Sequence, residues 1–262
     1  IHVDHNPNHD YRWGFFKTLR RHLDRDDVDA LIIAGDTPDR KDRHPAVFVD
    51  RLVREVEALA EVTATRKRPK PVVFIKGNHC YIDPDCPFFG FLRHIPNVEY
   101  FTHPGVLQLG PHKMLILPEG SGWGQGEKWR LKYPIGGIDG QRWGLIVTHE
   151  TFDGAMASTS VELKGISKHS SSKKSTNGCP IVSGDIHVPQ QIGNVLYAGS
   201  PHHVRFGDTY EPRMLLWDFD KDKAASIPLG GLRRITANYS FDDDGETIVT
   251  DAKIREGDHV KV

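Results

Sequence analysis

The chain has no long apolar run and very few cysteines. None of its apolar stretches approaches the roughly 18 consecutive residues that a membrane-spanning helix requires. No basic segment followed by an apolar core stands near the start, so the sequence indicates no secretion signal. The three cysteines are too few for a disulfide framework and lack the paired spacing of a structural zinc site. Free thiols suit a reducing compartment, and we expect the protein in the cytoplasm.

The chain also lacks an excess of charge of one sign. It has 34 Lys and Arg residues against 35 Asp and Glu residues, a net charge of −1 over 262 residues. A strongly basic domain, the simplest sign of nucleic-acid binding, is therefore excluded, although a local basic patch is not. Histidine is abundant, with 15 residues. Together with Gly-Asp and Gly-Asn-His turns, this abundance favours metal chemistry.

Four short apolar runs predict buried strands at residues 28–34, 72–75, 145–147 and 181–183. Helices are expected at 11–23 and from Pro45 onwards, where apolar residues recur at helical spacing. Further strands are predicted at 106–109, 113–117, 195–198 and 214–219. Residues 157–177 are rich in Ser, Thr and Lys and predict a flexible surface loop. The order of elements predicts an α/β (α+β) fold with two packed mixed β-sheets and helices outside.

Each of the four strands leads at once into polar residues that can bind a metal. These residues are Asp36, Asn78 with His79, His149, and Asp185 with His187. The carboxyl ends of neighbouring strands meet at one edge of a sheet, so we expect these side chains to converge. Glycines at 35, 77 and 184 permit tight turns and close backbone approach. Carboxylate, amide and imidazole donors without a thiolate suit Mn, Fe or Zn better than a structural zinc site.

The order Gly35-Asp36-Thr37-Pro38-Asp39, Gly77-Asn78-His79, Thr148-His149-Glu150 and Gly184-Asp185-Ile186-His187 resembles the calcineurin-like metallophosphoesterases. Within them the chain is most similar to the SbcD-type DNA repair exonucleases, including short phage-encoded relatives. Two further stretches also resemble that branch: Asn6-Pro7 with Tyr11-Arg12-Trp13, and Ala198-Gly199-Ser200-Pro201 with Arg205-Phe206-Gly207-Asp208. The likeness covers residues 1–230 and implies a four-layer sandwich. Residues 231–262 are then expected to begin a C-terminal accessory, or capping, region.

The resemblance implies a two-metal site. The family opens with Asp-x-His, and His2 falls at its histidine position, with the aspartate expected immediately before Ile1. His2 and His187 would hold the first metal, Asp36 would bridge both, and Asn78 and His149 would hold the second. Asp4 with Asn6 is the alternative at the first position, but no apolar strand precedes it. Mn is the favoured ion, with Fe, Zn or Mg as alternatives.

The chain departs from the family pattern at two positions of this site. His79 is implied to act as general acid or transition-state stabiliser, yet Cys80 follows it where many members have an acid. Asp185 stands where the family commonly has a histidine. A carboxylate there can still ligate a metal and favours Mn over Zn, so Asp185 is included among the metal ligands.

The resemblance implies hydrolysis of DNA phosphodiesters in a bacterial or phage-infected cell, with DNA, an SbcC-like ATPase and a second copy of the chain as partners. Two alternatives stay open: a phosphatase or phosphodiesterase for small nucleotides or phosphoproteins, and a catalytically impaired DNA-binding subunit. Basic clusters at 66–70, 128–132 and 164–174 could contact phosphates, and four lysines of the last cluster are the DNA-binding candidates: Lys164, Lys168, Lys173 and Lys174. The last cluster precedes the Gly184-Asp185-Ile186-His187 turn and is expected beside the metal edge. Trp123 and Trp129 are candidates to stack on unpaired bases, with a place over the core as the alternative. The opening at Ile1 without methionine and the end inside a strand at Val262 predict a fragment of a longer protein.

Overall fold

The structure is a computed structural model that describes residues 1–123, 132–138, 140–158, 161–241, 248–250 and 252–261. Trp129 and most of the predicted basic cluster at 128–132 lie outside these residues. No helix within the described part is long and apolar enough to cross a membrane. The predicted α/β class with packed sheets and few helices is confirmed.

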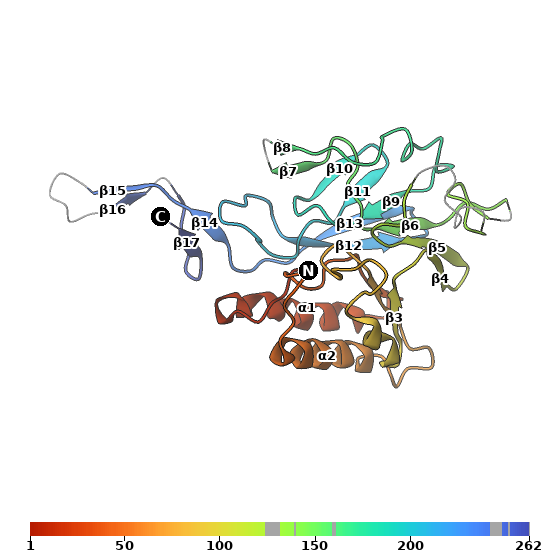
Figure 1. The fold of residues 1–262 in the computed structure, drawn as a ribbon, viewed down its shortest axis with the longest axis horizontal. Coiled ribbons are helices and arrows are strands. Elements are labelled where there is room, and N and C mark those ends of the chain that lie inside the picture. Colours follow the sequence, from red (N-terminus) through yellow and green to blue (C-terminus); the bar gives the residue numbers. More distant parts are fainter. Residues whose placement is uncertain (124–131, 139, 159–160, 242–247, 251, 262) are drawn as a thin grey trace.

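Two helices lie side by side against a small parallel sheet (Figure 1). The sheet has the order β1-β2-β3, formed by β1 (Leu31–Ile33), β2 (Val72–Ile75) and β3 (Val98–Phe101). Helices α1 (Gly14–Leu23) and α2 (Ala46–Glu61) bury apolar stripes, and a short 3-10 helix, η2 (Gly90–His94), precedes β3. In α2 the stripe is Phe48, Leu52, Val56 and Leu59, as the helical spacing predicted.

The helix predicted at residues 11–23 is only partly confirmed. Its first turn belongs to a 3-10 helix, η1 (Pro7–Trp13), and the α-helix begins only at Gly14. Pro7 stands at the first position of η1, and the Asn6 side chain accepts the Asn8 backbone N–H at 3.0 Å. The tighter winding buries both Arg12 and Trp13, which a regular apolar stripe would not anticipate.

The second sheet has six strands in the order β10-β11-β9-β6-β5-β4. Its centre is parallel: β5 (His112–Leu117), β6 (Leu145–Thr148), β9 (Ile181–Ser183) and β11 (Val195–Tyr197). Antiparallel strands β4 (Gly105–Leu109) and β10 (Gln190–Ile192) form the two edges. Because β6 is fully buried and β5 nearly so, their sequences are continuous apolar runs.

The predicted flexible loop at 157–177 was wrong in part. The segment overlaps the short hairpin of β7 (Met156–Ser158) and β8 (Val161–Glu162). Further along it, Ser171 and Thr176 are buried. Hydroxyl groups form hydrogen bonds within and around this segment. The Ser175 N–H lies 3.3 Å from Ser172 Oγ, and Thr176 Oγ1 accepts from Asn194 Nδ2 at 3.0 Å. Short hydrogen-bonding side chains thus order a segment that has little apolar content.

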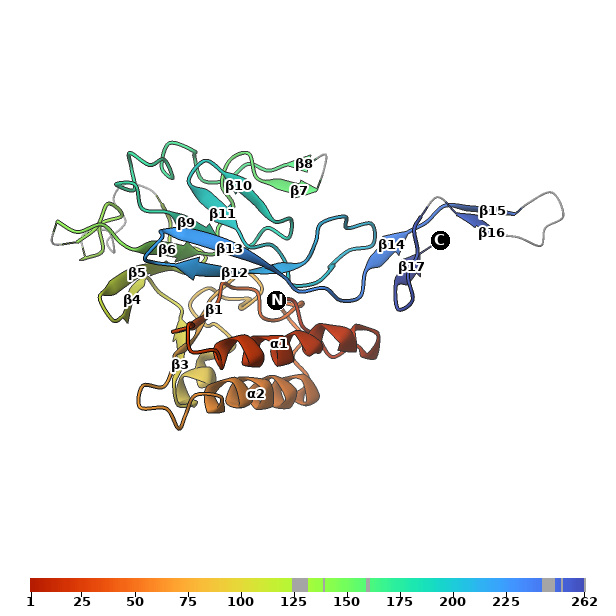
Figure 2. The same ribbon diagram turned by 180° about the vertical axis from the view of Figure 1, so that it is seen from behind.

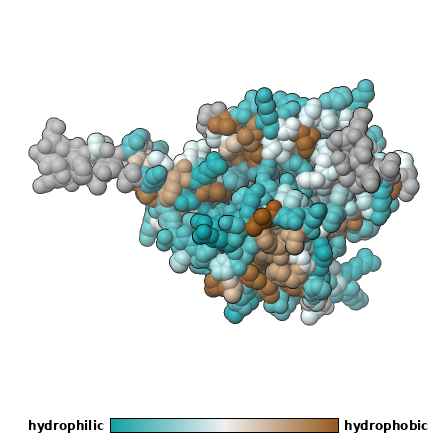
Figure 3. Space-filling view, in the orientation of Figure 1, coloured by the Kyte–Doolittle hydropathy of each residue, from teal (hydrophilic) through white to brown (hydrophobic). Residues whose placement is uncertain are grey.

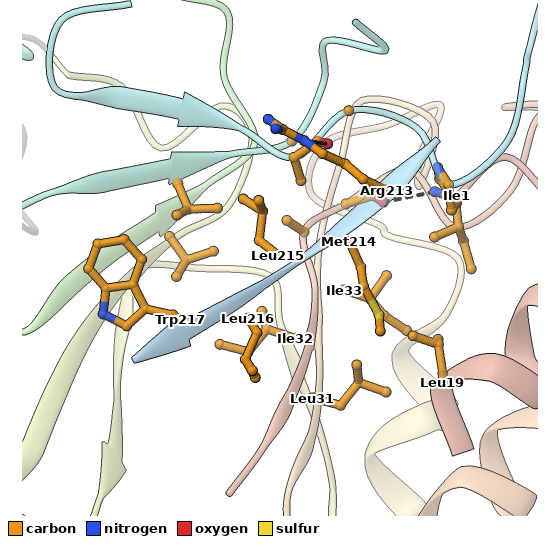
Figure 4. A pocket seen from close by; sticks show the side chains of 18 of the residues that line it. Ile1, Leu19, Leu31, Ile32, Ile33, Arg213, Met214, Leu215, Leu216 and Trp217 are labelled. Carbon is orange, nitrogen blue, oxygen red and sulfur yellow. Dashed lines mark hydrogen bonds between the residues drawn. The ribbon is translucent and has the colours of Figure 1, made fainter. Parts of the chain in front are cut away.

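A long hairpin, β12 (Arg213–Asp218) with β13 (Lys223–Pro228), lies close to both sheets (Figures 1 and 2). Between β1 and β12 lies an apolar cavity of about 270 Å³, which Leu31, Ile33, Met214 and Leu216 help to line (Figure 4). Ile1 also lines this cavity, and its backbone nitrogen donates to the Asp36 carbonyl at 2.5 Å.

The last strands form an arm that projects from the body (Figures 1 and 2). It consists of the parallel pair β14 (Arg234–Thr236) with β17 (His259–Lys261) and the antiparallel pair β15 (Tyr239–Phe241) with β16 (Ile248–Thr250). The strand predicted at the chain's end is confirmed as β17. The assignment of residues 231–262 to an accessory region stays a prediction.

Candidate metal centre

Five of the six predicted metal ligands follow strands of the two sheets, and the sixth, His2, lies ahead of η1, where its backbone N–H donates to the Asp36 carbonyl at 2.8 Å. Asp36 follows β1 and Asn78 follows β2, whereas His149 follows β6, and Asp185 and His187 follow β9. Their approach depends on glycine. A Cβ at Gly35, which has φ +93°, would lie 2.0 Å from His149 Nδ1, and a Cβ at Gly184 would lie 1.9 Å from the Ala34 carbonyl oxygen.

Asp36 lies at the centre of the cluster and faces two sides with its two oxygens. Its Oδ1 lies 3.3 Å from His149 Nε2, and its Oδ2 lies 3.8 Å from His2 Nε2 and 3.9 Å from His79 Nε2. Among the described residues, two groups of potential ligand atoms therefore share Asp36: one with His2 and His79, the other with His149 and Asp185. This arrangement is compatible with a carboxylate bridging two cations.

The remaining predicted ligands border these groups. His187 Nε2 lies 2.9 Å from His2 Nε2. Asp185 Oδ1 lies 3.8 Å from His149 Nε2 and 3.4 Å from Asn78 Nδ2, and the Thr151 hydroxyl donates to its other oxygen. Asp185 thus points into the cluster at the position where the family commonly has histidine.

The donor atoms fit a metal because several are buried without a hydrogen-bond partner in the described part of the chain. They include His149 Nε2 and the Asn78 side-chain oxygen. His149 Nδ1 is engaged with the Ala34 carbonyl at 2.7 Å, which orients the ring and directs its other nitrogen toward Asp36. A buried polar atom without a partner is costly, and a divalent cation would satisfy these atoms.

The electrostatics of the cluster favour a bound cation. Burial tends to raise the pKa of Asp36, but the neighbouring imidazoles, His149 foremost, hold that pKa well below its ordinary value. Burial lowers the pKa of His2 to about 3, against the opposing hydrogen bond to Asp39. Burial also lowers the pKa of His187. At His149, burial tends to lower the pKa, but the charge of Asp36 and the hydrogen bond to it raise that pKa to about 9. The ionised Asp36 and the neutral His2 and His187 are in the protonation state that metal ligands require, whereas a cation would displace the proton from His149.

His79 is oriented by a backbone carbonyl. Its Nδ1 lies 2.8 Å from the Asp39 carbonyl oxygen, and its Nε2 faces Asp36, while its backbone N–H donates to Asp36 Oδ1 at 2.8 Å. The Asp39 carbonyl thus orients His79 although Cys80 stands where many family members have an acid. The Cys80 thiol is buried, accepts the Gly77 N–H at 3.4 Å, and is not needed to hold the imidazole.

Three residues near the centre were missed as functional candidates. Arg12 is buried, donates to the His2 carbonyl at 2.7 Å and lies 3.1 Å from Asp39 Oδ1. Asp39 Oδ1 in turn lies 3.6 Å from His2 Nδ1. Burial, followed by the charge of Arg12, lowers the pKa of His202 well below its ordinary value. The motifs Tyr11-Arg12-Trp13 and Gly199-Ser200-Pro201 were the available sequence signals for Arg12 and His202.

The alternative first ligand, Asp4, does not belong to either group of candidate ligand atoms. Its carboxylate accepts the Asn6 N–H at 3.0 Å and lies 2.6 Å from His9 Nδ1. Asp4 therefore organises the start of η1, and His2 is the better candidate.

The four candidate DNA-binding lysines are exposed but do not lie together. The segment with Lys164 and Lys168 packs beside Thr151, because the Ile166 N–H donates to the Thr151 carbonyl at 2.9 Å. Lys173 and Lys174 lie in a turn near the amino end of β9, away from the ligands that follow its carboxyl end. The prediction that the whole loop borders the metal edge is thus wrong for Lys173 and Lys174. Trp123, the other stacking candidate, is buried against Phe152.

Comparisons with known proteins agree with this architecture. The model of the calcineurin-like phosphoesterase family matches residues 1–189. The crystal structure of TT1561 of Thermus thermophilus is similar in fold, with a TM-score of 0.50 and 12% identity, over 84% of this chain and 93% of that chain. No curated protein matches the chain. On the family match and the converging ligand set, this chain belongs to the calcineurin-like phosphoesterases, a family of metal-dependent phosphoester hydrolases.

Proposed function

We propose that the chain hydrolyses phosphodiester bonds in DNA with the aid of two divalent cations, as an SbcD-like nuclease. The observation that carries the proposal is the sharing of Asp36 between two groups of candidate ligand atoms, one with His2 and His79 and the other with His149 and Asp185. The similarity of Tyr11-Arg12-Trp13 and Gly199-Ser200-Pro201 to SbcD-type nucleases supports DNA as the substrate. Free cysteines are consistent with action in the cytoplasm.

His2 and His187 are assigned to the first cation, Asn78, His149 and Asp185 to the second, and Asp36 to both. Three of these ligands offer oxygen atoms, which favours Mn²⁺ over Zn²⁺. Two such cations polarise a phosphoryl group and lower the pKa of water, so no protein nucleophile is required. Thr151 positions Asp185 through its hydroxyl group, and the Ala34 carbonyl fixes the ring of His149.

His79 is assigned to the leaving group. Its ring is half-buried at the cluster, and the Asp39 carbonyl holds Nδ1, so Nε2 is directed toward the reacting phosphate. From there Nε2 can donate a proton or a hydrogen bond to the departing oxygen.

The proposal predicts that the protein degrades linear DNA in Mn²⁺ and loses this activity in EDTA. Release of acid-soluble nucleotides from end-labelled duplex DNA measures the reaction. A chromogenic phosphodiester, assayed in parallel at the same metal occupancy, reports on chemistry that needs no DNA contact. Hydrolysis of small phosphoesters alone would favour a small-molecule phosphatase or phosphodiesterase. Binding of Mn²⁺ and DNA without turnover of either substrate would indicate an impaired subunit.

We further predict that Lys164 and Lys168 guide DNA toward the centre, because they flank the segment that contacts Thr151. Replacing both with serine should reduce the slope of log affinity against log salt by about 0.7–0.9 for each lysine–phosphate pair that the substitutions remove. The matched control replaces Lys173 and Lys174, which are equally exposed but lie away from the ligands. Fluorescence anisotropy over a range of salt concentrations measures both variants. Equal slopes in the two variants would contradict the assignment, as would a loss of activity on the small phosphodiester.

A further inference from the structure

An open groove of about 720 Å³ lies between η1 and the C-terminal arm. One wall is residues 6–11, and the other includes Phe206, Arg234 and His259. Figure 3 shows apolar surface at the root of the arm, near β14. The acidic side chains of the groove are paired: Asp258 lies 2.5 Å from Arg233, and Asp10 pairs with Arg51. The groove therefore combines exposed rings with cationic groups whose charge is not opposed by free carboxylates.

This groove is joined to the metal centre through the backbone and through rings in edge-to-face contact. The Ser200 N–H donates to the His187 carbonyl at 2.9 Å, so the segment that leads to Phe206 starts at a predicted metal ligand. The Tyr11 ring lies 6.1 Å from the ring of buried His202 and 5.4 Å from that of His259. A ligand that spans the centre and the groove would thus pass along Tyr11.

Phe206 is presented to the groove by a fixed turn. The Asp208 carboxylate accepts the Val204 N–H at 2.9 Å and the Arg205 N–H at 2.8 Å. The Gly207 N–H donates to the Arg234 carbonyl at 2.9 Å, with φ +84° at Gly207. The turn leaves the Phe206 ring 36% exposed.

The Phe206 ring also contacts a cationic side chain. The Arg234 guanidinium lies 4.1 Å from its centroid, a cation–π contact that fixes the ring and places positive charge beside it. Arg205, next along the turn, is exposed and forms no ion pair with any described residue. The Asp208 carboxylate holds the backbone N–H of Arg205, so the same turn carries the guanidinium of Arg205 and the ring of Phe206, which lines the groove.

We propose that this groove binds a single-stranded segment of nucleic acid next to the scissile phosphodiester, with an unpaired base stacked on Phe206 and a phosphate on Arg205. The inference rests on the proposed function and extends it from DNA in general to an unpaired strand. Only an unpaired base offers a free face to a protein ring, and base–aromatic stacking is tolerant of sequence. The guanidinium supplies the phosphate contact that stacking lacks.

The test measures binding separately from hydrolysis. A fluorescein-labelled oligothymidylate of about 12 nucleotides, within the range of single-strand site sizes, is titrated in EDTA and followed by anisotropy. Phe206→Ala should weaken binding about tenfold, Phe206→Trp should retain it, and Arg205→Ser should flatten its salt dependence. The matched control is Phe91→Ala, since Phe91 is 38% exposed on η2 and does not line the groove. Hydrolysis of a small chromogenic phosphodiester in Mn²⁺ should be unchanged in Phe206→Ala.

Three results would overturn the inference: equal binding by the Phe206→Ala and Phe91→Ala variants, equal weakening for a blunt duplex of the same length, or loss of activity on the small phosphodiester. The first would show that the ring does not touch the strand, the second that stacking on an unpaired base is not involved, and the third that the ring supports the centre itself. Phe206-dependent binding of the single strand by a protein that cleaves no DNA would uphold the groove and refute the nuclease proposal alone.

Discussion

Replacing Asp36 with alanine is expected to remove Mn²⁺ binding and phosphodiester hydrolysis together. The two oxygens of Asp36 face the two groups of candidate ligands, so a single substitution takes a donor from both cations. Outer-shell substitutions at metal sites cost about 10–100-fold in affinity, and loss of a shared ligand should exceed that range. Isothermal titration with Mn²⁺ gives the stoichiometry and affinity.

Thermal unfolding provides a second readout for this variant. A cation present at about 100 times its Kd stabilises the folded state by about 2.7 kcal/mol, which raises the Tm of a chain of this size by several degrees. Mn²⁺ should produce this shift in the wild type and leave the Tm of Asp36→Ala unchanged. Asp4→Asn is the matched control, because Asp4 is also buried but lies outside both ligand groups. Retention of one Mn²⁺ at wild-type affinity in Asp36→Ala would show that the carboxylate is not shared.

Replacing His79 with alanine is expected to lower the rate by about 10²–10⁴-fold and to leave Mn²⁺ binding nearly intact. The Asp39 carbonyl holds Nδ1, and Nε2 lies 3.9 Å from Asp36 Oδ2. We assign Nε2 to the substrate and not to a cation, although His79 belongs to one of the two groups of candidate ligand atoms. Titration calorimetry and steady-state kinetics on the same samples measure both quantities. A loss of metal equal to that of Asp36→Ala would reject this role.

The leaving group distinguishes two versions of the role of His79. If His79 protonates the departing oxygen, the defect of His79→Ala should shrink for a phosphodiester with a nitrophenolate leaving group, which departs without a proton. If it only stabilises charge on the phosphoryl oxygens, the defect should be the same for both kinds of substrate. Cys80→Ala is the companion variant, and it should keep most of its activity because the Asp39 carbonyl, and not the thiol, holds the His79 ring.

Much of the centre could be predicted because its local signals are strong. Strands such as 72–75 and 145–148 are buried along almost their whole length, so they appear as apolar runs that stop abruptly at the polar residues. Gly35 and Gly184 mark turns where the backbone comes within contact of His149 or Ala34, and a side chain there would collide. Within each sheet the ligands converge because the strands before them are parallel, which brings Asp36 near Asn78 and His149 near Asp185.

Other features depend on contacts between distant segments, and no local pattern encodes them. The carbonyl that orients His79 belongs to Asp39, 40 residues earlier in the chain. The groove beside Phe206 forms only because the last strand, β17, lies near η1. Likewise, two of the four candidate lysines lie away from the centre, since hydroxyl groups order residues 171–176 against the amino end of β9.

The sequence by itself determined the α/β class, the strand ends that carry the ligands, and the chemistry of the donor set. Each buried strand is a continuous apolar run, so a short stretch of sequence is enough to recognise it. Only the tertiary structure decided that Arg12 is buried beside His2 and Asp39, and that Asp36 faces two ligand groups at once. The environment of a polar group is set by residues distant in the chain, and its sequence neighbours do not contain that information.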